Sequence, residues 1–543
     1  MKVVIVGGVA GGAGAAARLR RNDEYADIIL LERGEHISFA NCGLPYYIGD
    51  VIPKESSLLL QTPQSFHSRF NVDVRVRHEC MSVDTLNKTV QVKNLHTGEV
   101  YTQSYDKLLL SPGAKPVMPP LPGVESNHIF TLRNIPDTLA IKNYVENMAP
   151  KSCAVIGGGF IGLEMAENLK EKGLDVSIIE GTSHVIGPLD VDMAHDIHNY
   201  IRAKGISLHL NSKAARISPQ VVELEDGKLV QADMVIMSVG VVPETGFLSE
   251  SGIVRGKRGE IIVNEYLETS APDVYAVGDA IASKHYVSGQ NTIVALASCA
   301  NKQARIVADN MCGLAQKYTG AQGTAIAKFF DMSIAVTGLS EAALAANNIP
   351  FLKSITYSSS NAGYYPGGQM MSIKLLYSPG NGRVLGAQIT GGKGVDKRID
   401  VIATAIRARM TVFDLQELEL AYAPPFSSAK DPVNMAGFVA GNIMTGKMYP
   451  YYVEDLEQLN DALFLDVRTS KEFAQGSIPG AINIPLDELR ERLDQVDKSK
   501  QLYVFCQIGL RGYVAEQLLR QQGYEVKNLV GGFRLYHATN SDR

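Results

Sequence analysis

Residues 152–162 read SCAVIGGGFIG, and this stretch decides the fold. Its first five residues are a short, continuous apolar run, which predicts a buried parallel strand. The remainder satisfies the G-x-G-x-x-G pattern, in which glycines let the backbone approach a pyrophosphate at a helix N-terminus. Its three glycines are Gly157, Gly159 and Gly162.

The residues that follow complete a dinucleotide-binding βαβ unit. A helix is predicted over 163–172, and a second strand over 175–179 ends at Glu180. An acid at the end of this strand accepts hydrogen bonds from an unphosphorylated ribose, whereas a 2′-phosphate favours an arginine there. Glu180 therefore favours NADH, with NADPH left open because nearby loops can supply basic residues.

The N-terminus carries a second copy of this pattern. A strand over 2–6 (KVVIV) leads into GGVAGG (7–12), an alanine-rich helix over 13–21 and a strand over 28–31. Gly7, Gly11 and Gly12 are candidates for the pyrophosphate turn, and Glu32 for the ribose. Val9 replaces the middle glycine, so this copy departs from the strict pattern.

Two later segments fit a chain with two dinucleotide sites. Residues 105–114 (YDKLLLSPGA) predict a strand that leaves the first βαβ unit at a turn containing Gly113. Residues 273–279 (DVYAVGD) predict a strand that ends in Gly278 and Asp279. The Asp279 carboxylate could accept a hydrogen bond from a ribityl hydroxyl of a flavin. We therefore expect one dinucleotide held permanently and one exchanged.

Composition limits the classes of function that the protein can have. The 543 residues carry a formal net charge of −5, which does not favour nucleic acid or an anionic membrane. No run of about 18 apolar residues predicts a membrane span, and MKVVIVGGVAGG does not resemble a signal peptide. The six cysteines form neither a CxxC pair nor a zinc-like quartet, so we expect free thiols, no metal site and the cytoplasm.

Residues 38–47 (SFANCGLPYY) are where we expect the chemistry. Cys42 stands in a predicted turn about ten residues beyond Glu32, with no second cysteine near it in sequence. A lone thiol beside a cofactor suggests that the partner sulfur arrives on the substrate. A flavin and a helix N-terminus nearby are expected to lower the pKa of this thiol.

The motifs GGVAGG, GGGFIG, SPGA and YAVGDA resemble those of the pyridine nucleotide-disulfide oxidoreductases over about residues 1–445. Within that family SFANCGLPY resembles the coenzyme A (CoA)-disulfide reductases and NADH-dependent CoA-persulfide reductases, the single-cysteine branch. The resemblance implies FAD in the first Rossmann-like domain (1–112 and 243–317), NAD(P)H in the second (113–242), and an α+β dimerisation domain (318–445).

The same resemblance supplies further site residues. Tyr364 and Tyr422 match tyrosines that reach into the partner subunit's active site, and the alternative for turn tyrosines, Tyr365 included, is packing at a dimer surface. CoA carries phosphates, so cations should line its approach. The matching substrate contacts are Arg18, Arg21, Ser38, Asn41 and Lys430, with Arg69 a weaker candidate and a solvated helix face the alternative for Arg18 and Arg21.

After a linker at 446–452 a new α/β pattern begins. A strand over 502–505 runs into Cys506-Gln507-Ile508-Gly509-Leu510-Arg511 and then a helix, so backbone N–H groups surround the cysteine and stabilise sulfur anions. This C-x₄-R loop, one residue shorter than the C-x₅-R loop of cysteine phosphatases, resembles that of a single α/β rhodanese domain (453–543). Cys506 would carry a persulfide beside Arg511. A further helix is predicted over 486–495.

The sequence therefore predicts a homodimeric flavoprotein that reduces CoA disulfide, CoA persulfide or polysulfide at Cys42, while Cys506 relays sulfane sulfur. One alternative is an NADH oxidase that reduces oxygen through a Cys42 sulfenic acid. Another is a non-enzymatic redox or sulfur sensor.

Overall fold

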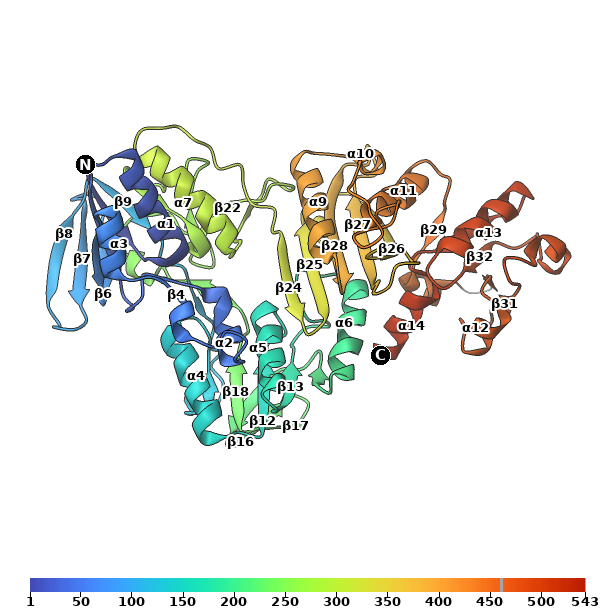
Figure 1. The fold of residues 1–543 in the computed structure, drawn as a ribbon, viewed down its shortest axis with the longest axis horizontal. Helices are drawn as coiled ribbons and strands as arrows, with labels where there is room; N and C mark the ends of the chain where they lie inside the picture. The colour runs from blue at the N-terminus through green and yellow to red at the C-terminus, as the bar shows by residue number, and fades with distance from the viewer. Residues whose placement is uncertain (460–461, 543) are drawn as a thin grey trace. The chain divides into compact units, whose positions relative to one another are not determined.

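A computed structural model describes residues 1–459 and 462–542. The chain forms two compact units (Figure 1). The first contains residues 1–183 and 206–323. The second contains residues 184–205 and everything described from 324 onward. The mixed α/β class predicted from the sequence is confirmed.

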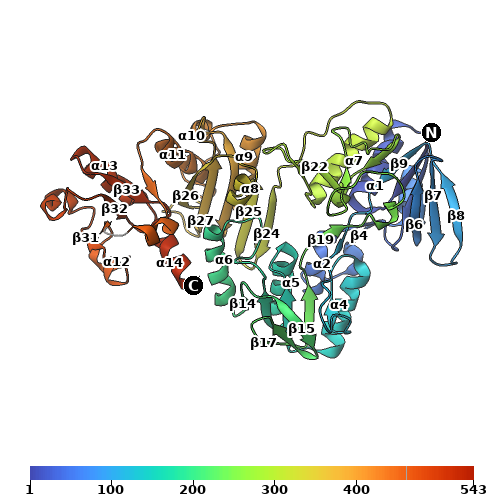
Figure 2. The ribbon, with the colours of Figure 1, turned by 180° about the vertical axis from the view of Figure 1, so that it is seen from behind.

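The first sheet of the first unit is parallel, in the order β21-β9-β1-β2-β5. Its central residues are fully buried, as expected when both faces of a parallel sheet are covered. Helices α1 and α7 pack against each other beside it (Figures 1 and 2). The elements are β1 (Lys2–Val6), α1 (Val9–Asn22), β2 (Asp27–Glu32), β5 (Asp73–Val76), β9 (Lys107–Leu110), β21 (Val274–Ala276) and α7 (Ala297–Met311), with an antiparallel layer of β6 (His78–Asp84), β7 (Thr89–Asn94) and β8 (Val100–Ser104).

The second sheet repeats this arrangement around SCAVI, in the parallel order β11-β18-β12-β13-β14. Register pairs such as Val155↔Ile178 keep β12 and β13 level, so the glycine turn and Glu180 meet at one sheet edge. The elements are β11 (Ile129–Phe130), α4 (Ile135–Met148), β12 (Ser152–Ile156), α5 (Phe160–Glu171), β13 (Asp175–Ile179), β14 (Ser207–His209) and β18 (Met234–Met237), with an antiparallel layer of β15 (Ala214–Ser218), β16 (Gln220–Leu224) and β17 (Leu229–Ala232).

The second unit begins with an antiparallel sheet in the order β24-β25-β28-β27-β26. Alternating apolar residues at 325–331, 333–337, 351–357 and 371–377 predict four of these strands, whereas the central strand β28 was not predicted. Helix α9 packs on β25 and β28, and α11 packs on β26. The elements are β24 (Ala325–Phe329), β25 (Met332–Gly338), α8 (Glu341–Ala346), β26 (Leu352–Ser359), β27 (Met370–Tyr377), β28 (Val384–Gly391), α9 (Val395–Arg407), α10 (Val412–Glu417) and α11 (Pro432–Met444).

Helix α6 (Val191–Ala203) belongs to this second unit, although its sequence lies inside the predicted NAD(P)H-binding segment. It packs against β28 and the C-terminal helix α14 (Gly532–Asp542; Figure 1). The fully buried ammonium of Lys374 fixes the start of the helix, pairing with Asp190 at 3.0 Å and Asp192 at 2.7 Å, and with Glu341. Lys374 therefore lies among three carboxylates, and Lys353 also pairs with Glu341 at 3.0 Å.

The C-terminal domain is a parallel sheet in the order β29-β33-β32-β30-β31. Pro450 and Tyr451 form the edge strand β29, so the predicted linker ends in folded structure. The elements are β29 (Pro450–Tyr451), β30 (Leu463–Asp466), α12 (Ser470–Ala474), β31 (Ile482–Asn483), β32 (Leu502–Phe505), α13 (Leu510–Gln521), β33 (Val526–Leu529) and α14 (Gly532–Asp542).

The helix predicted over 486–495 is wrong. That segment forms two 3₁₀ turns, Leu489–Glu491 and Leu493–Gln495, separated at Arg492. The break lets Leu489 and Val496 both enter the domain core, and this packing outweighs the helix propensity of the segment.

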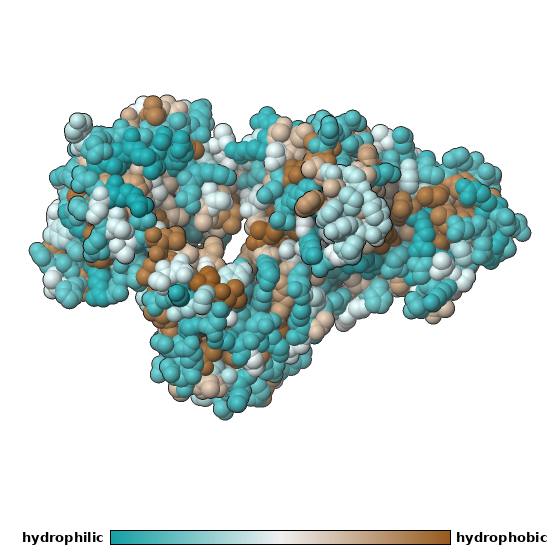
Figure 3. Space-filling model, in the orientation of Figure 1, coloured by the Kyte–Doolittle hydropathy of each residue, from teal (hydrophilic) through white to brown (hydrophobic). Residues whose placement is uncertain are grey.

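No helix in the described ranges 1–459 and 462–542 is long and apolar enough to cross a membrane. On the face drawn in Figure 3, hydrophilic side chains dominate and apolar groups form small patches.

Candidate active site

Cys42 lies in the 3₁₀ turn Asn41–Gly43, directly before the short helix α2 (Leu44–Ile48). All six cysteines are free thiols in the structure, and Cys42 is the exposed one among them. Helix α2 packs against α4 and α5 of the second dinucleotide fold. Beyond α2, Asp50 receives the ammonium groups of Lys142 and Lys172. The thiol turn is thus fixed to both nucleotide folds.

Two carboxyl groups approach Cys42 from different elements. Glu164 lies on α5, where the Tyr46 hydroxyl donates to its Oε1 over 3.4 Å, and burial raises the pKa of Glu164 to about 7. Asp279 follows β21, and burial also raises its pKa. The pKa of Cys42 is raised by partial burial first and then by the negative charges of Glu164 and Asp279. The protein groups alone therefore act against the predicted lowering, which depends on a bound flavin.

Both glycine turns are closed by the acid that the sequence pattern predicts. The Gly8 N–H donates to Glu32 Oε2 over 2.9 Å, and the Gly158 N–H donates to Glu180 Oε2 over 2.7 Å. The same two carboxylates also accept from backbone N–H groups two residues beyond them, at Gly34 and Thr182. Each acid is therefore held at the mouth of its turn by the backbone.

The third glycine of each turn is required for close packing. A Cβ at Gly12 would lie 1.8 Å from the Gly7 carbonyl oxygen, and one at Gly162 would lie 2.0 Å from that of Gly157. The Gly159 position is open, with no atom within 4 Å of a Cβ. Val9, which breaks the first pattern, has a left-handed φ of +56°, a conformation that β-branched residues rarely adopt.

The residues predicted for a flavin fit that group. The half-buried Asp279 carboxylate accepts no hydrogen bond from any residue in the described part of the chain, so its oxygens are available to ligand hydroxyls. Gly113 and Gly278 both have positive φ, and nothing lies within 4 Å of a Cβ at Gly113. Gly11 faces Ser111, whose hydroxyl would be 2.4 Å from its Cβ. Gly113 is thus the open position of the three, whereas Gly11 and Gly278 are buried beside Ser111.

The residues predicted to contact the substrate differ in whether another residue of the protein already engages their side chains. Ser38 and the exposed Asn41 lie beside Cys42 in β3 (Ser38–Phe39) and the thiol turn. Arg21 lies in the last turn of α1. Arg18 is engaged by Asp309, Nε to Oδ1 at 2.7 Å, so an anion would have to share it. The weaker candidate Arg69 lies in the last turn of α3 (Pro63–Phe70).

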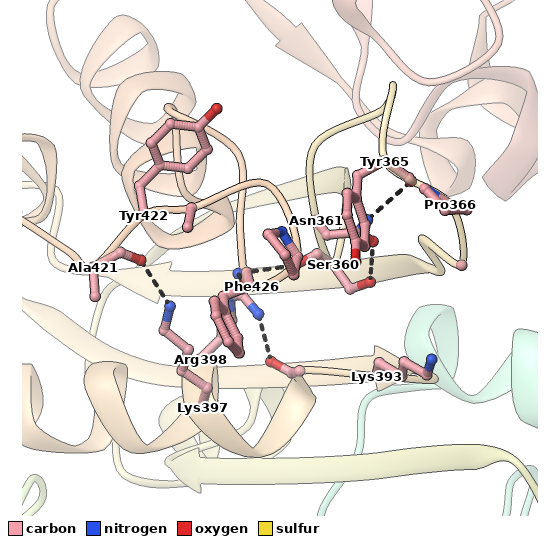
Figure 4. Close-up of a pocket in the computed structure, with 14 residues that line it drawn as sticks. Ser360, Asn361, Tyr365, Pro366, Lys393, Lys397, Arg398, Ala421, Tyr422 and Phe426 are labelled. Carbon is pink, nitrogen blue, oxygen red and sulfur yellow. Dashed lines mark hydrogen bonds between the residues drawn. The ribbon is translucent and has the colours of Figure 1, made fainter.

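In the second unit the structure brings Tyr364 and Tyr422 together. Their hydroxyls are 2.9 Å apart, and this hydrogen bond raises the pKa of Tyr422. Both rings are exposed, Tyr364 at 77%, as expected of aromatic residues that a partner surface covers. Tyr422 and Tyr365 line a cavity of about 530 Å³ (Figure 4). Lys430 is exposed just before α11.

Cys506 ends β32 and is 1% exposed. The Gly509 N–H donates to its Sγ over 3.2 Å, and α13 begins one residue later. Gly509 has φ +98°, the left-handed conformation that turns the loop around the sulfur. Gly509 is thus one backbone donor to the sulfur at the place where the succession of strand, loop and helix predicts a nest of such donors.

Arg511 is held at the loop by Glu472, through a bidentate ion pair at 2.7 and 2.8 Å. This pair lowers the pKa of Glu472 to about 2. Below the loop, Arg468 pairs with the fully buried Asp466 at 2.7 Å and stacks on Phe533. The Glu472–Arg511 and Asp466–Arg468 ion pairs therefore hold the side chains around the sulfur loop in place.

Sequence reasoning assigned no role to Glu164, Tyr46 or Glu472. Tyr46 stands four residues after Cys42, a spacing that places both on one side of a helical turn, and this was the available signal. Glu164 gave no such signal, because only the packing of α2 on α5 brings it to the thiol.

The two dinucleotide folds, the antiparallel domain and the sulfur loop define a flavin- and nicotinamide-dependent oxidoreductase with an added sulfur-carrier domain. The chain belongs to the pyridine nucleotide-disulphide oxidoreductase family, which it matches over residues 1–304. Residues 324–432 match the dimerisation domain of that family, and residues 450–539 match the rhodanese-like domain. FAD and NAD(P)H are the cofactors of this family.

Particular relatives extend over most or all of the chain. The coenzyme A disulfide reductase of Staphylococcus haemolyticus is 36% identical over 81% of this chain and 100% of its own. The crystal structure of reduced Bacillus anthracis CoADR-RHD is 47% identical with a TM-score of 0.98, over 100% of this chain and 98% of the other. An NAD-dependent persulfide reductase from A. fulgidus is 35% identical with a TM-score of 0.92, over 99% and 100%.

Proposed function

We propose that the protein is a homodimeric FAD enzyme that uses NADH, or NADPH, to reduce the disulfide or persulfide of coenzyme A at Cys42. The observation that carries this proposal is the setting of Cys42. It is the exposed thiol of the six, and charges from both Glu164 on α5 and Asp279 beyond β21 act on it. A single thiol that lies between two dinucleotide folds is suited to pass electrons from a bound dinucleotide to a sulfur substrate.

Bound FAD, reduced by NAD(P)H, supplies the two electrons that the reaction consumes. The Cys42 sulfur attacks one sulfur of CoA disulfide, and the bond between the two CoA halves breaks. One half is then joined to Cys42, and the other leaves as a thiolate that takes a proton. Two-electron reduction of the new disulfide releases the second CoA thiol and restores the Cys42 thiolate. With CoA persulfide, attack on the outer sulfur frees CoA thiol and leaves a persulfide on Cys42, which reduction releases as hydrosulfide.

The dimer would complete each site. Tyr364 and Tyr422 share one hydrogen bond and are exposed, so either phenol could donate a proton to a leaving thiolate at the partner subunit's Cys42. Ser38 and Asn41 flank the thiol, and Arg21, Arg18 and Lys430 supply positive charge for the CoA phosphates.

The rhodanese-like domain would supply sulfane sulfur. Cys506 carries it as a persulfide, stabilised by the Gly509 N–H and by Arg511. Transfer to CoA thiol makes the CoA persulfide that Cys42 then reduces, so persulfide and polysulfide are favoured over simple CoA disulfide. Free thiols and a thiol product suit the cytoplasm.

One assay tests the proposal: NADH oxidation by the purified flavoprotein with CoA disulfide, CoA persulfide and polysulfide in parallel. Cys42→Ser should abolish all three activities, and full activity with any of them would remove Cys42 from the mechanism. Cys506→Ser should reduce only polysulfide turnover. The buried Cys153 offers a matched control as Cys153→Ala, which should leave all three rates unchanged.

The alternative functions predict different outcomes. An oxygen-reducing NADH oxidase would consume NADH without a sulfur substrate, and its rate would follow dissolved oxygen. A sensor would purify without bound yellow flavin. The rhodanese-like domain has no part in oxygen reduction, which favours the sulfur substrate.

A further inference from the structure

The dimerisation domain contains a pocket that the proposed mechanism does not yet use. Its volume is about 530 Å³, within the usual range for small-molecule sites. It lies between the turn after β26, the start of α9 and the loop before α11 (Figure 4). We call it the α9 pocket. Its lining includes Tyr365, Lys393, Lys397, Arg398, Tyr422 and Phe426.

The α9 pocket has an excess of positive charge. It is lined by two lysines and an arginine and by no aspartate or glutamate. The Arg398 charge is already matched by Asp431 at 2.9 Å. Lys397 is 3.7 Å from the same carboxylate and donates to the Ala421 carbonyl over 3.3 Å. Lys393 makes no ion pair with any carboxylate within the described residues. Lys393 therefore remains available to an anion, whereas an anion would have to share Lys397 with Asp431 and the Ala421 carbonyl.

Three aromatic rings also line the α9 pocket, and Phe426 lies beside Arg398 (Figure 4). Tyr365, Tyr422 and Phe426 are 41%, 47% and 70% exposed, which is unusual for rings that line a concave site. Such rings are suited to stack on a purine base. The first turn of α9 follows its N-cap Gly394 without a side-chain cap and so offers backbone N–H donors to a phosphate, while Asp396 in the same turn adds one negative charge. Cations with aromatic rings fit the phosphate-bearing adenosine end of CoA.

The proposed reaction needs such a site. A CoA disulfide has two identical halves, and the residues proposed near Cys42 serve only the half that becomes attached to it. The other half carries the same phosphates and must also be held as it leaves. Tyr422 lines the α9 pocket and is the proposed proton donor to that leaving thiolate, so the leaving CoA would bind with its pantetheine arm folded back toward its nucleotide.

We infer that the α9 pocket binds the adenosine-phosphate end of the CoA thiol that leaves when the partner subunit's Cys42 attacks CoA disulfide. This inference rests on the proposed function. It predicts two nucleotide subsites per active site, one used by the retained half and one by the leaving half.

The test uses the FAD-containing dimer with Cys42 converted to its mixed disulfide with CoA, which fills the first subsite. Calorimetric titration with adenosine 3′,5′-bisphosphate should give one further site per chain. Lys393→Glu with Lys397→Glu should weaken this binding by roughly tenfold to a hundredfold, the range for losing charged hydrogen bonds. Lys328→Glu, an exposed charge reversal on β24 of the same domain, is the matched control and should not change it.

Kinetics give a second readout. In the double variant the KM for CoA disulfide should rise while the KM for pantethine, the same disulfide without the nucleotide, stays constant. The inference would be overturned if the CoA-capped dimer bound no nucleotide, or if the double variant bound it as tightly as the parent. Equal loss with both disulfides or a monomer in sedimentation would also overturn it, because each indicates a structural role. Failure of CoA to attach to Cys42 would instead refute the proposed function.

Discussion

Two glycines of the NAD(P)H turn should separate folding from cofactor binding. A Cβ at Gly162 would lie 2.0 Å from the Gly157 carbonyl oxygen and 2.8 Å from the Ser238 hydroxyl. Backbone cannot yield easily, so Gly162→Ala should cost about 1–3 kcal/mol, the range for overpacking. For a domain of this size, 2 kcal/mol is roughly 4–8 °C in Tm.

Gly159→Ala should behave differently. Nothing lies within 4 Å of its Cβ, and its φ of −75° and ψ of −172° suit alanine. Its Tm should therefore stay within about 2 °C of the parent. The added methyl group would enter the space where the turn meets the pyrophosphate, so the KM for NADH should rise about tenfold or more.

Calorimetry of the holoenzyme and steady-state kinetics at varied NADH measure both effects. Gly187→Ala is the control, because that glycine is exposed, has open space around its Cβ and lies outside both turns. Unchanged Tm in Gly162→Ala, or a larger loss of Tm in Gly159→Ala, would refute the geometric reasoning.

Three further substitutions test the electrostatics. Burial raises the pKa of Glu164 to about 7, so the stability that this carboxyl contributes is fully present below pH 4.5 and is lost as pH rises through 7. Glutamine does not ionise, so in Glu164→Gln up to about 3 kcal/mol of this pH-dependent fall in the free energy of unfolding should disappear, as measured by urea unfolding at varied pH. Arg468→Met should cost about 3–5 kcal/mol by leaving a buried carboxylate unpaired, whereas the exposed Arg492→Met should cost under about 1; similar losses would contradict the burial argument. Glu472→Gln should free Arg511 and lower thiosulfate sulfurtransferase activity about tenfold, with CoA disulfide reduction unchanged, and Glu472→Asp should recover part of it. Since the Glu472 pKa is lowered to about 2, its contribution to stability is fully present above pH 4.5 and is lost as pH falls through 2.

The sequence predicted those features that depend on local geometry. The turns at Gly157 and Gly7 and the loop at Cys506 each require a strand, a tight turn and a helix in direct succession, and such patterns are visible in neighbouring residues. The acids Glu32 and Glu180 were predictable for the same reason.

Features that depend on packing between distant segments were not predictable. The pKa of Cys42 is raised first by burial and then by the charges of Glu164 and Asp279, both more than a hundred residues away in sequence. Strand β28 was missed because its glycines at 386 and 391 weaken the strand pattern, although Gly386 is needed where the Leu339 backbone approaches to 2.0 Å from a Cβ. The helix predicted at 486–495 rested on an amphipathic sequence. In the structure the apolar residues of this segment reach the core from two 3₁₀ turns instead.

Helix α6 has a consequence for any attempt to divide the protein. The chain passes between the two units at residues 183–184, 205–206 and 323–324, so no single cut separates them. A fragment ending near 323 would keep α6 but lose the sheet and the C-terminal helix that cover Met193, Ile197 and Ile201. Such a fragment would expose these side chains and aggregate, and limited proteolysis at one site should leave the two pieces associated.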